Sequence, residues 1–178
     1  MTVYVAMLRG VNVGGNSLKM DWLRQACEGL GLQNVRTYVQ SGNIVFASRA
    51  SAAKLAQTLK ETIDAQTRLP VTVVLRSVAD MERIVTDNPF LKQKGVDVTK
   101  LHVTFLGKVP VKPVLDRLDA LAGTRDQYRL HGSELYLNCP VNYGETRLSN
   151  SAIEKLLGVG ATTRNLKTVM TLRQMAAE

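Results

Sequence analysis

The order in which hydrophobic periodicity changes along the chain constrains the fold more than any other feature. An apolar run at Val3–Arg9 predicts a strand, and apolar residues at helical spacing follow it until Gly31. The runs "VRTYV" and "NIVFA", separated by "QSG", predict the two strands of a hairpin. A second helical pattern at residues 55–63 and a strand at Val71–Arg76 complete the order βαββαβ, which is the ferredoxin-like motif.

The second half of the chain repeats much of this order. Leu101–Gly107 predicts a strand, and "DQYRLHGSELYLN" predicts a hairpin that turns at residues 131–133, as the first hairpin turns at Ser41 and Gly42. Three apolar residues at helical spacing lie between these strands: Val114, Leu118 and Leu121. We therefore predict an α+β fold of two ferredoxin-like (βαββα-type) halves that are related by structural duplication.

Capping patterns locate the remaining helices. Ser77–Asp80 predicts one helix start, and Ser151 and Glu154 have the spacing of a capping box at another. The last helix is predicted to start near Thr163. The predicted parts are an N-terminal ferredoxin-like half at 1–76, a helix and connector at 77–100, and a C-terminal half with its closing helix at 101–178.

The charge of the chain favours anionic partners. The 178 residues carry a formal charge of +8, and the pI is about 9.7. Such a balance suits phosphate, nucleic acid or an acidic protein. The charge is spread, however, because residues 1–89 carry +3 (10 Lys and Arg, 7 Asp and Glu) and residues 90–178 carry +5 (13 and 8). Without a basic run, nucleic acid is the less favoured partner.

The apolar segments and cysteines bear on the compartment. No apolar run approaches the roughly 20 residues of a membrane span, and the N-terminus lacks the basic region of a signal peptide. Cys27 and Cys139 have no CxxC partner, and two cysteines make no disulfide framework. Helical spacing puts Cys27 on an apolar face, where we predict a buried thiol. We expect a cytoplasmic protein without a membrane partner, and the sequence leaves its oligomeric state open.

Several stretches resemble one family as a set. They are "LRGVNVGGN", "KMDWLRQACEGLGLQNVRTYVQSGNIVF", "NPF", "NYGETRL" and "SNSAIEKLLGVGATTRNLKTV". Taken in order, they cover almost the whole chain and resemble the bacterial domain-of-unknown-function family 1697. The resemblance implies a two-part α+β protein with ferredoxin-like halves, and it implies no reaction.

The turn "MLRGVNVGGN", which ends at Asn16, is rich in glycine and polar residues. Gly14 and Gly15 suit the positive φ angles of a tight turn. Together with Arg9 and Asn12 they also suit an anion site, because glycine-rich strand-to-helix turns expose backbone N–H groups. The sequence leaves both interpretations open. The same holds for "QSGN", which is first of all a turn and also offers amide and hydroxyl groups.

Lys19 and Arg164 are both predicted at or just before the first turn of a helix. A cation there opposes the helix dipole at a cost of about 0.3–1 kcal/mol, and a bound anion would offset this cost. We hypothesise one anion site between the opening turn and the last helix; the alternative is two tolerated, exposed cations. Arg164→Ala is then expected to weaken binding by about 1.5–3 kcal/mol with little change in stability. The predicted ligand-binding residues are Arg9, Asn12, Gly14, Gly15, Lys19, Ser41, Asn43, Thr163, Arg164 and Asn165.

Motifs for catalysis and metal binding are absent from the sequence. It contains no Walker A or GxGxxG loop, GxSxG elbow or HExxH pair. His102 and His131 have no ligand partner at metal spacing, so we predict no metal and no cofactor. Trp22 and Met20 are predicted to pack in the core and not to form a base-stacking platform. The second aromatic motif of RNA-binding ferredoxin-like domains is missing.

The leading hypothesis is a protein that binds a phosphate-bearing or other anionic small molecule. Whether it is also an enzyme stays open. The alternative is a nucleic-acid or protein interaction module without catalysis. Salt separates the two, because binding to a polyanion weakens steeply as the salt concentration rises.

Overall fold

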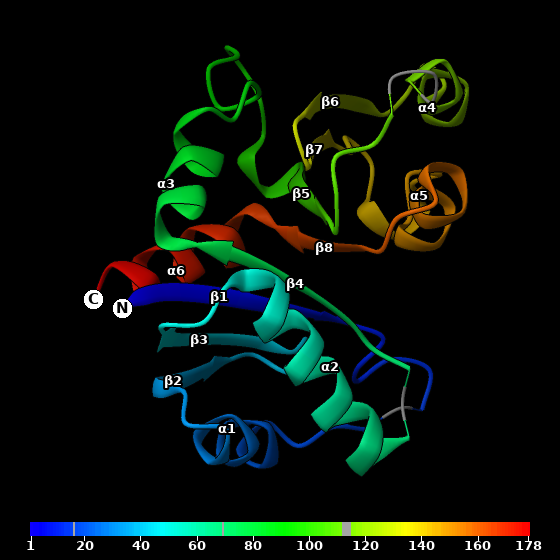
Figure 1. Cartoon of the computed structure of the whole chain (residues 1–178). Helices are drawn as coiled ribbons and strands as arrows, with labels where there is room; N and C mark the ends of the chain where they lie inside the picture. Colours follow the sequence, from blue (N-terminus) through cyan, green and yellow to red (C-terminus); the bar gives the residue numbers. More distant parts are fainter. Residues whose placement is uncertain (16, 69, 112–114) are drawn as a thin grey trace. The chain divides into compact units, whose positions relative to one another are not determined.

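The computed structural model describes residues 1–15, 17–68, 70–111 and 115–178. These residues form two compact units, Met1–Arg83 with Thr171–Glu178, and Ile84–Met170. Each unit contains a four-stranded antiparallel sheet with helices, shown in Figure 1, so the predicted α+β fold with two similar halves is confirmed. Asn16 of the opening turn and Val114 of the predicted helix face lie outside the described residues.

The first unit has the ferredoxin-like order that the periodicity predicts. Its elements are β1 (Thr2–Arg9), α1 (Met20–Gly29), β2 (Gln33–Tyr38), β3 (Asn43–Ser48), α2 (Ala52–Thr67) and β4 (Thr72–Ser77). The strands lie in the order β2-β3-β1-β4. Leu23 of α1 and Leu59 of α2 pack with Leu8 and Phe46 of the sheet, so both helices cover the same face.

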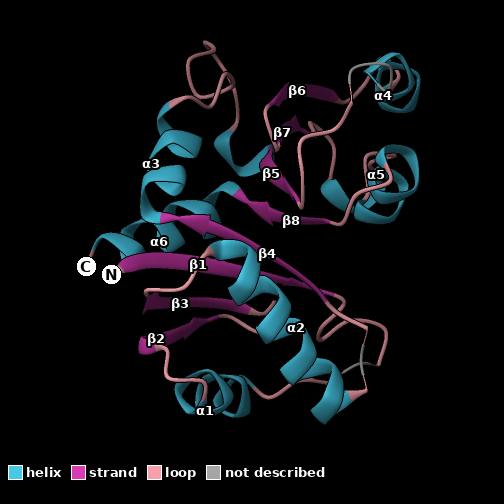
Figure 2. Ribbon diagram, in the orientation of Figure 1, coloured by secondary structure: helices cyan, strands magenta, loops and turns pink. Residues whose placement is uncertain are grey.

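The second unit repeats this sheet. Its strands are β5 (Leu101–Leu106), β6 (Gln127–His131), β7 (Glu134–Asn138) and β8 (Ala161–Asn165). They lie in the order β6-β7-β5-β8, the same pattern as in the first sheet, and Figure 2 shows both sheets in magenta. Helices α4 (Leu115–Ala122) and α5 (Asn150–Leu157) supply Leu118 and Ile153 to a core that contains Leu106 of β5. Short 3-10 helices span Val98–Lys100 and Tyr143–Glu145.

Helix α3 (Val78–Thr86) begins at the predicted capping box. The Ser77 N–H donates to Asp80 Oδ2 (3.0 Å), and the Asp80 N–H donates to Ser77 Oγ (3.1 Å). These reciprocal bonds satisfy backbone donors that a helix start otherwise leaves without a partner. The boundary between the two units falls within α3 and within α6 (Leu166–Ala177).

The predicted start of the last helix near Thr163 is wrong. Residues 161–165 form strand β8, and α6 begins at Leu166. Thr162 and Thr163 pair with residues of β5 in antiparallel register. Their β-branched side chains suit a strand, and this pairing across the sheet outweighs the local capping pattern.

The predicted capping box of α5 is also displaced. The cap is Ser149, whose Oγ accepts a hydrogen bond from the N–H of Ala152 (3.3 Å). Ser151 lies inside the helix. Glu154 Oε1 accepts from the N–H of Ala161 (3.1 Å) and thereby joins α5 to the start of β8. The helix therefore begins two residues earlier than the spacing of Ser151 and Glu154 predicts.

Candidate functional site

The opening loop lies between β1 and α1, and its described part, residues 10–15 and 17–19, is held in place by Asn12. The Asn12 Nδ2 donates to the carbonyl oxygens of Leu18 (3.0 Å) and Gln40 (2.6 Å), and its Oδ1 accepts from the Leu18 N–H (2.7 Å). Asn12 has a φ of 53°, in the left-handed region that asparagine adopts more readily than most residues. Since both ends of the amide bind the protein, Asn12 shapes the loop.

The turn of the first hairpin packs tightly against this loop. Gly42 has a φ of +76°, and a Cβ atom added there would lie 2.7 Å from Val11 Cγ2 and 2.9 Å from Leu8 Cβ. The Leu8 N–H also donates to the Gly42 carbonyl oxygen (2.9 Å). Only glycine satisfies both the backbone angle and this close approach. The opening loop and the hairpin turn are thus one packed structure.

Ser41 and Asn43 belong to the same packed structure. Asn43 is fully buried, and its Nδ2 donates to the Tyr38 carbonyl oxygen (2.9 Å) and to Ser41 Oγ (2.9 Å). A buried amide with such partners stabilises the turn. These contacts favour the interpretation of "QSGN" as a structural turn.

Helix α1 begins without a side-chain cap. Lys19 occupies the N-cap position in extended backbone, and its side chain makes no capping hydrogen bond. Four other helices have a side chain that accepts from a first-turn N–H, namely Ser51 for α2, Ser77 for α3, Ser149 for α5 and Asn165 for α6. The first turn of α1 also carries an acid, Asp21, as predicted. Among the described residues, no side chain accepts a hydrogen bond from the backbone N–H groups of this first turn, so they are open to solvent or to a ligand.

A hollow of about 380 Å³ lies beside this helix start. It is lined by Gly15, Ser17, Leu18, Lys19, Trp22, Gln66 and Thr67. The topology explains why α1 and α2 meet there. Helix α1 follows β1, while α2 ends just before β4, which is antiparallel to β1. The start of α1 and the end of α2 therefore lie at the same edge of the sheet.

Several polar side chains of the hollow are not used by the protein. Among the residues that the structure describes, none forms a side-chain hydrogen bond or ion pair with Ser17, Lys19, Trp22 or Gln66. Trp22 is half-buried and packs against the core of the first unit, as predicted, and it also lines the hollow. The hollow thus presents a hydroxyl, an ammonium, an indole N–H and an amide.

The glycines of the opening loop leave its backbone open. Gly14 and Gly15 have φ angles of 59° and 89°, which agrees with the positive φ predicted for them. A Cβ atom added at either position would meet no atom within 4 Å. A ligand could therefore approach the backbone of this loop closely.

Arg9 does not line this hollow. Arg9 follows Leu8 in β1, and the Leu8 side chain packs against α1 and α2 on one face of the sheet. Arg9 therefore lies on the opposite face of the sheet, where its register partner in β4 is Thr72. Of the predicted ligand-binding residues, the hollow includes Gly15 and Lys19.

Arg164 lies in β8 of the second unit and is buried, with 8% of its surface exposed. Its Nη1 donates to Thr162 Oγ1 (2.8 Å) and to the Thr163 carbonyl oxygen (2.9 Å). Burial lowers the pKa of the guanidinium to about 10, and attraction to Tyr143 opposes the shift. The prediction of an exposed cation at a helix start is therefore wrong for Arg164. Because the side chain is buried, its removal is no longer expected to leave stability unchanged.

Thr163 and Asn165, the neighbours of Arg164, also have structural partners. Thr163 Oγ1 donates to Asn150 Oδ1 (2.7 Å) and lies 2.7 Å from Thr104 Oγ1. Asn165 Oδ1 caps α6 by accepting from the N–H of Thr168 (2.8 Å). These residues belong to the second unit and the opening loop belongs to the first. The shared anion site remains a prediction.

The histidine and cysteine side chains present little that could act as a nucleophile or hold a metal. Burial lowers the pKa of His102, which stacks on Tyr143 with ring centroids 4.6 Å apart. Cys27 and Cys139 are buried, as predicted for Cys27, and burial raises their pKa values to about 12 and about 11. Within the described ranges, no three His, Cys, Asp or Glu side chains are grouped to hold a metal ion. No described helix is long and apolar enough to cross a membrane.

Comparison with known proteins extends the resemblance in the sequence. The family model "Protein of unknown function (DUF1697)" matches residues 1–136, which include the whole hollow. The structure of a conserved bacterial protein from Streptococcus pneumoniae is similar to the chain, with a TM-score of 0.82 and 25% sequence identity over 100% of this chain and 99% of that one. A search of curated proteins finds no significant match. These similarities support the fold and name no ligand.

Proposed function

Because the chain belongs to the DUF1697 family of proteins of unknown function, we propose its function from the geometry: it binds a phosphate-bearing or other anionic small molecule in the hollow at the start of α1. Lys19 provides the charge, Ser17 a hydroxyl donor, and Gly15 an accessible backbone. The observation that carries the proposal is the exposed lysine at the uncapped start of α1, beside a hollow of about 380 Å³.

Electrostatics favours an anion at this point. The start of a helix carries partial positive charge, so a cation at the N-cap is unfavourable by about 0.3–1 kcal/mol. An anion between Lys19 and the first-turn N–H groups would make both sources of positive charge favourable. The volume of the hollow also lies within the range typical of small-molecule sites.

The rest of the opening loop supports the site indirectly. Asn12 and Gly42 fix the loop through hydrogen bonds and close packing. A loop held in this way loses little conformational freedom when a ligand binds, which favours affinity. Asn12, Ser41 and Asn43 are therefore proposed to position the loop and not to contact the ligand.

The proposal can be tested with pyrophosphate as the probe. Binding is measured by isothermal titration calorimetry, because an inorganic anion need not change the fluorescence of Trp22, the only tryptophan of the chain. We expect saturable binding of pyrophosphate at constant ionic strength. Lys19→Gln should weaken this binding by about 10- to 100-fold, since a hydrogen bond to a charged group contributes about 1.5–3 kcal/mol.

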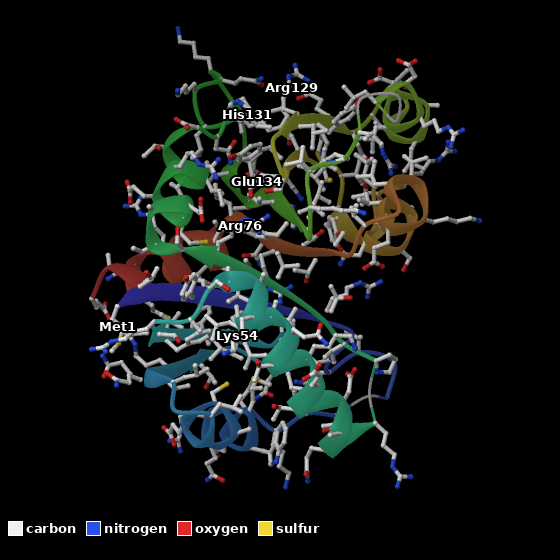
Figure 3. The ribbon with its side chains drawn as sticks, viewed as in Figure 1. Met1, Lys54, Arg76, Arg129, His131 and Glu134 are labelled. Atoms are coloured by element: carbon white, nitrogen blue, oxygen red, sulfur yellow. The ribbon has the colours of Figure 1, made fainter. Side chains whose placement is uncertain are left out.

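Lys54→Gln is the matched control. Lys54, labelled in Figure 3, is an exposed lysine in the first turn of α2, and that helix is capped by Ser51. Its replacement removes the same charge and should leave pyrophosphate binding unchanged. If the two variants weaken binding equally, or if pyrophosphate does not bind saturably, the proposed site is rejected. Native mass spectrometry of freshly purified protein would then search for a co-purifying ligand elsewhere.

A salt titration separates the proposal from a nucleic-acid module. A protein that contacts several phosphates loses about 10³- to 10⁵-fold in affinity between roughly 50 and 200 mM salt. A fluorescent oligonucleotide should bind this chain weakly at both concentrations. Tight binding with a steep salt dependence that Lys19→Gln leaves unchanged would favour the interaction module instead.

A further inference from the structure

We infer that the ligand of this hollow carries a planar aromatic ring as well as its anionic group, as a nucleotide does, with the ring stacked on Trp22 and its edge bound by Gln66. The inference rests on the proposed function and adds the class of ligand to it. Its basis is the part of the hollow away from the backbone of the opening loop, which an inorganic anion would leave unfilled.

Trp22 is placed to act as a stacking surface. It lies three residues after Lys19, so the indole and the ammonium group lie on the same side of α1. Part of the ring packs against the core of the first unit, and part of it lines the hollow. The packed part holds the ring in place, and the remaining aromatic surface is available to a second flat ring.

The indole N–H supports this interpretation. Across residues 1–15, 17–68, 70–111 and 115–178, the Trp22 N–H has no hydrogen-bond partner, and it is not among the buried polar atoms that lack one. The N–H is therefore accessible to solvent and to a ligand in the hollow, and a tryptophan at such a boundary has an apolar body and a polar tip. A side chain needed only for packing could be a phenylalanine or leucine, whereas an indole at the rim of a hollow also offers a donor.

Gln66 completes the set of groups that a nucleobase requires. It lies in the last turn of α2, and its exposed amide makes no hydrogen bond within the described part of the chain. An amide offers a donor and an acceptor side by side, which matches the edge of a base. The amides of Asn12 and Asn43 differ from that of Gln66, because they donate hydrogen bonds to backbone carbonyl oxygens.

The experiment compares three probes by isothermal titration calorimetry: adenosine 5′-monophosphate, ribose 5-phosphate and pyrophosphate. Stacking of a base on an aromatic side chain contributes about 5- to 100-fold in affinity. The nucleotide should therefore bind at least about 5-fold more tightly than ribose 5-phosphate. It should also quench Trp22 fluorescence, whereas ribose 5-phosphate should not.

Variants then assign the effect to Trp22 and Gln66. Trp22→Leu should lower nucleotide affinity to that of ribose 5-phosphate, and Trp22→Phe should retain most of it. Gln66→Ala should weaken the nucleotide alone. Gln25→Ala, at an exposed position of α1, should change nothing. The quenching measurement uses the unmodified protein, so it stands if Trp22→Leu does not fold.

The outcomes separate the two proposals. If the nucleotide and ribose 5-phosphate bind equally and neither quenches Trp22, the aromatic ligand is ruled out while the anion site stands. If pyrophosphate, ribose 5-phosphate and the nucleotide all fail to bind, the anion site is ruled out as well. Nucleotide binding that Trp22→Leu and Gln66→Ala leave unchanged would place the ring elsewhere and overturn the inference.

Discussion

The two units of the chain share one sheet pattern and differ in the packing of their hairpin turns and in the burial of a cation that the sequence predicts near a helix start. Their strands follow the orders β2-β3-β1-β4 and β6-β7-β5-β8. The hairpin turn of the first unit is closed against the opening loop at Gly42, whereas a Cβ atom at Gly132 in the second hairpin would meet nothing within 4 Å. The two cations also differ in burial: Lys19 is exposed at the uncapped start of α1, and Arg164 is buried in strand β8.

This difference shows that a shared topology does not give shared sites. The two hairpin turns are equivalent in the topology, whereas Lys19 precedes α1 and Arg164 lies in β8. Packing and capping decide which polar groups are left for a ligand. Arg164 makes hydrogen bonds to its own strand, and α6 is capped by Asn165. Lys19 has no side-chain partner among the described residues. A cation near a helix start in the sequence is therefore informative only once its burial is known.

The largest effect is expected from removing the buried cation. Arg164→Ala should lower the free energy of unfolding by about 3–5 kcal/mol, because it creates a cavity and removes the donor that the buried Thr162 Oγ1 accepts from. Lys19→Ala, at the exposed position, should stay within about 0.5 kcal/mol. Urea unfolding followed by circular dichroism measures both. Equal changes in the free energy of unfolding would show that the buried Arg164 contributes no more to stability than the exposed Lys19.

The hairpin turns provide a second matched pair. Gly42→Ala should lower the free energy of unfolding by about 2–4 kcal/mol. The alanine would have to adopt a left-handed φ, and its Cβ atom would overlap Val11 and Leu8. Gly132 lies in the turn between His131 and Glu134, which are labelled in Figure 3. Gly132→Ala should cost about 1 kcal/mol, since the φ of 61° at this position is strained for alanine but its surroundings are open. Thermal or urea unfolding compares them. A Gly132→Ala variant as unstable as Gly42→Ala would show that backbone angle alone accounts for both.

Much of the fold follows from local patterns in the sequence. Hydrophobic spacing predicts the strand at Val3–Arg9 and the order βαββαβ, and Lys19 is placed correctly before α1. Strand β8 is missed because its sequence, "ATTRN", has no apolar run, and because Thr162 and Thr163 also suit a helix start. Its identity depends on pairing with β5, which is a contact between distant parts of the sequence.

The candidate site is harder to predict, because burial and hydrogen-bond partners decide it. Asn12 looks like a ligand group in the sequence, yet its amide holds Leu18 and Gln40. Gln66 carries no motif, and it reaches the hollow because α2 ends at the sheet edge where α1 begins. The βαββαβ order implies this meeting point, so the topology is the pattern from which Gln66 could have been found.

Protonation of His102 should destabilise the second unit at acidic pH. Burial lowers the pKa of His102 in the folded state, so the unfolded chain binds more protons below about pH 6.5. Stability is then constant above that pH and falls as the pH drops below it, by at most about 1.4 kcal/mol per pH unit. Urea unfolding between pH 7.5 and 5 measures this slope.

His102→Gln should remove that part of the pH dependence. His131→Gln, at an exposed position of β6, should retain it. The stacking of His102 on Tyr143 gives the buried ring its fixed environment, and β6 offers His131 no comparable burial. Identical slopes for the two variants and the unmodified protein would contradict the assignment to His102.

The smallest change in stability is expected at Lys19, where an anion site favours a cation and the start of α1 favours a capping residue. Lys19→Ser should raise the free energy of unfolding by about 0.5–1 kcal/mol, because serine supplies the cap that Ser51 and Ser149 give to α2 and α5. It also removes a cation from the positive end of α1. The same change should weaken pyrophosphate binding by about 10-fold or more. Unfolding and calorimetry on one preparation measure both effects. Lower stability in this variant would mean that Lys19 stabilises the fold and is not kept for a bound anion.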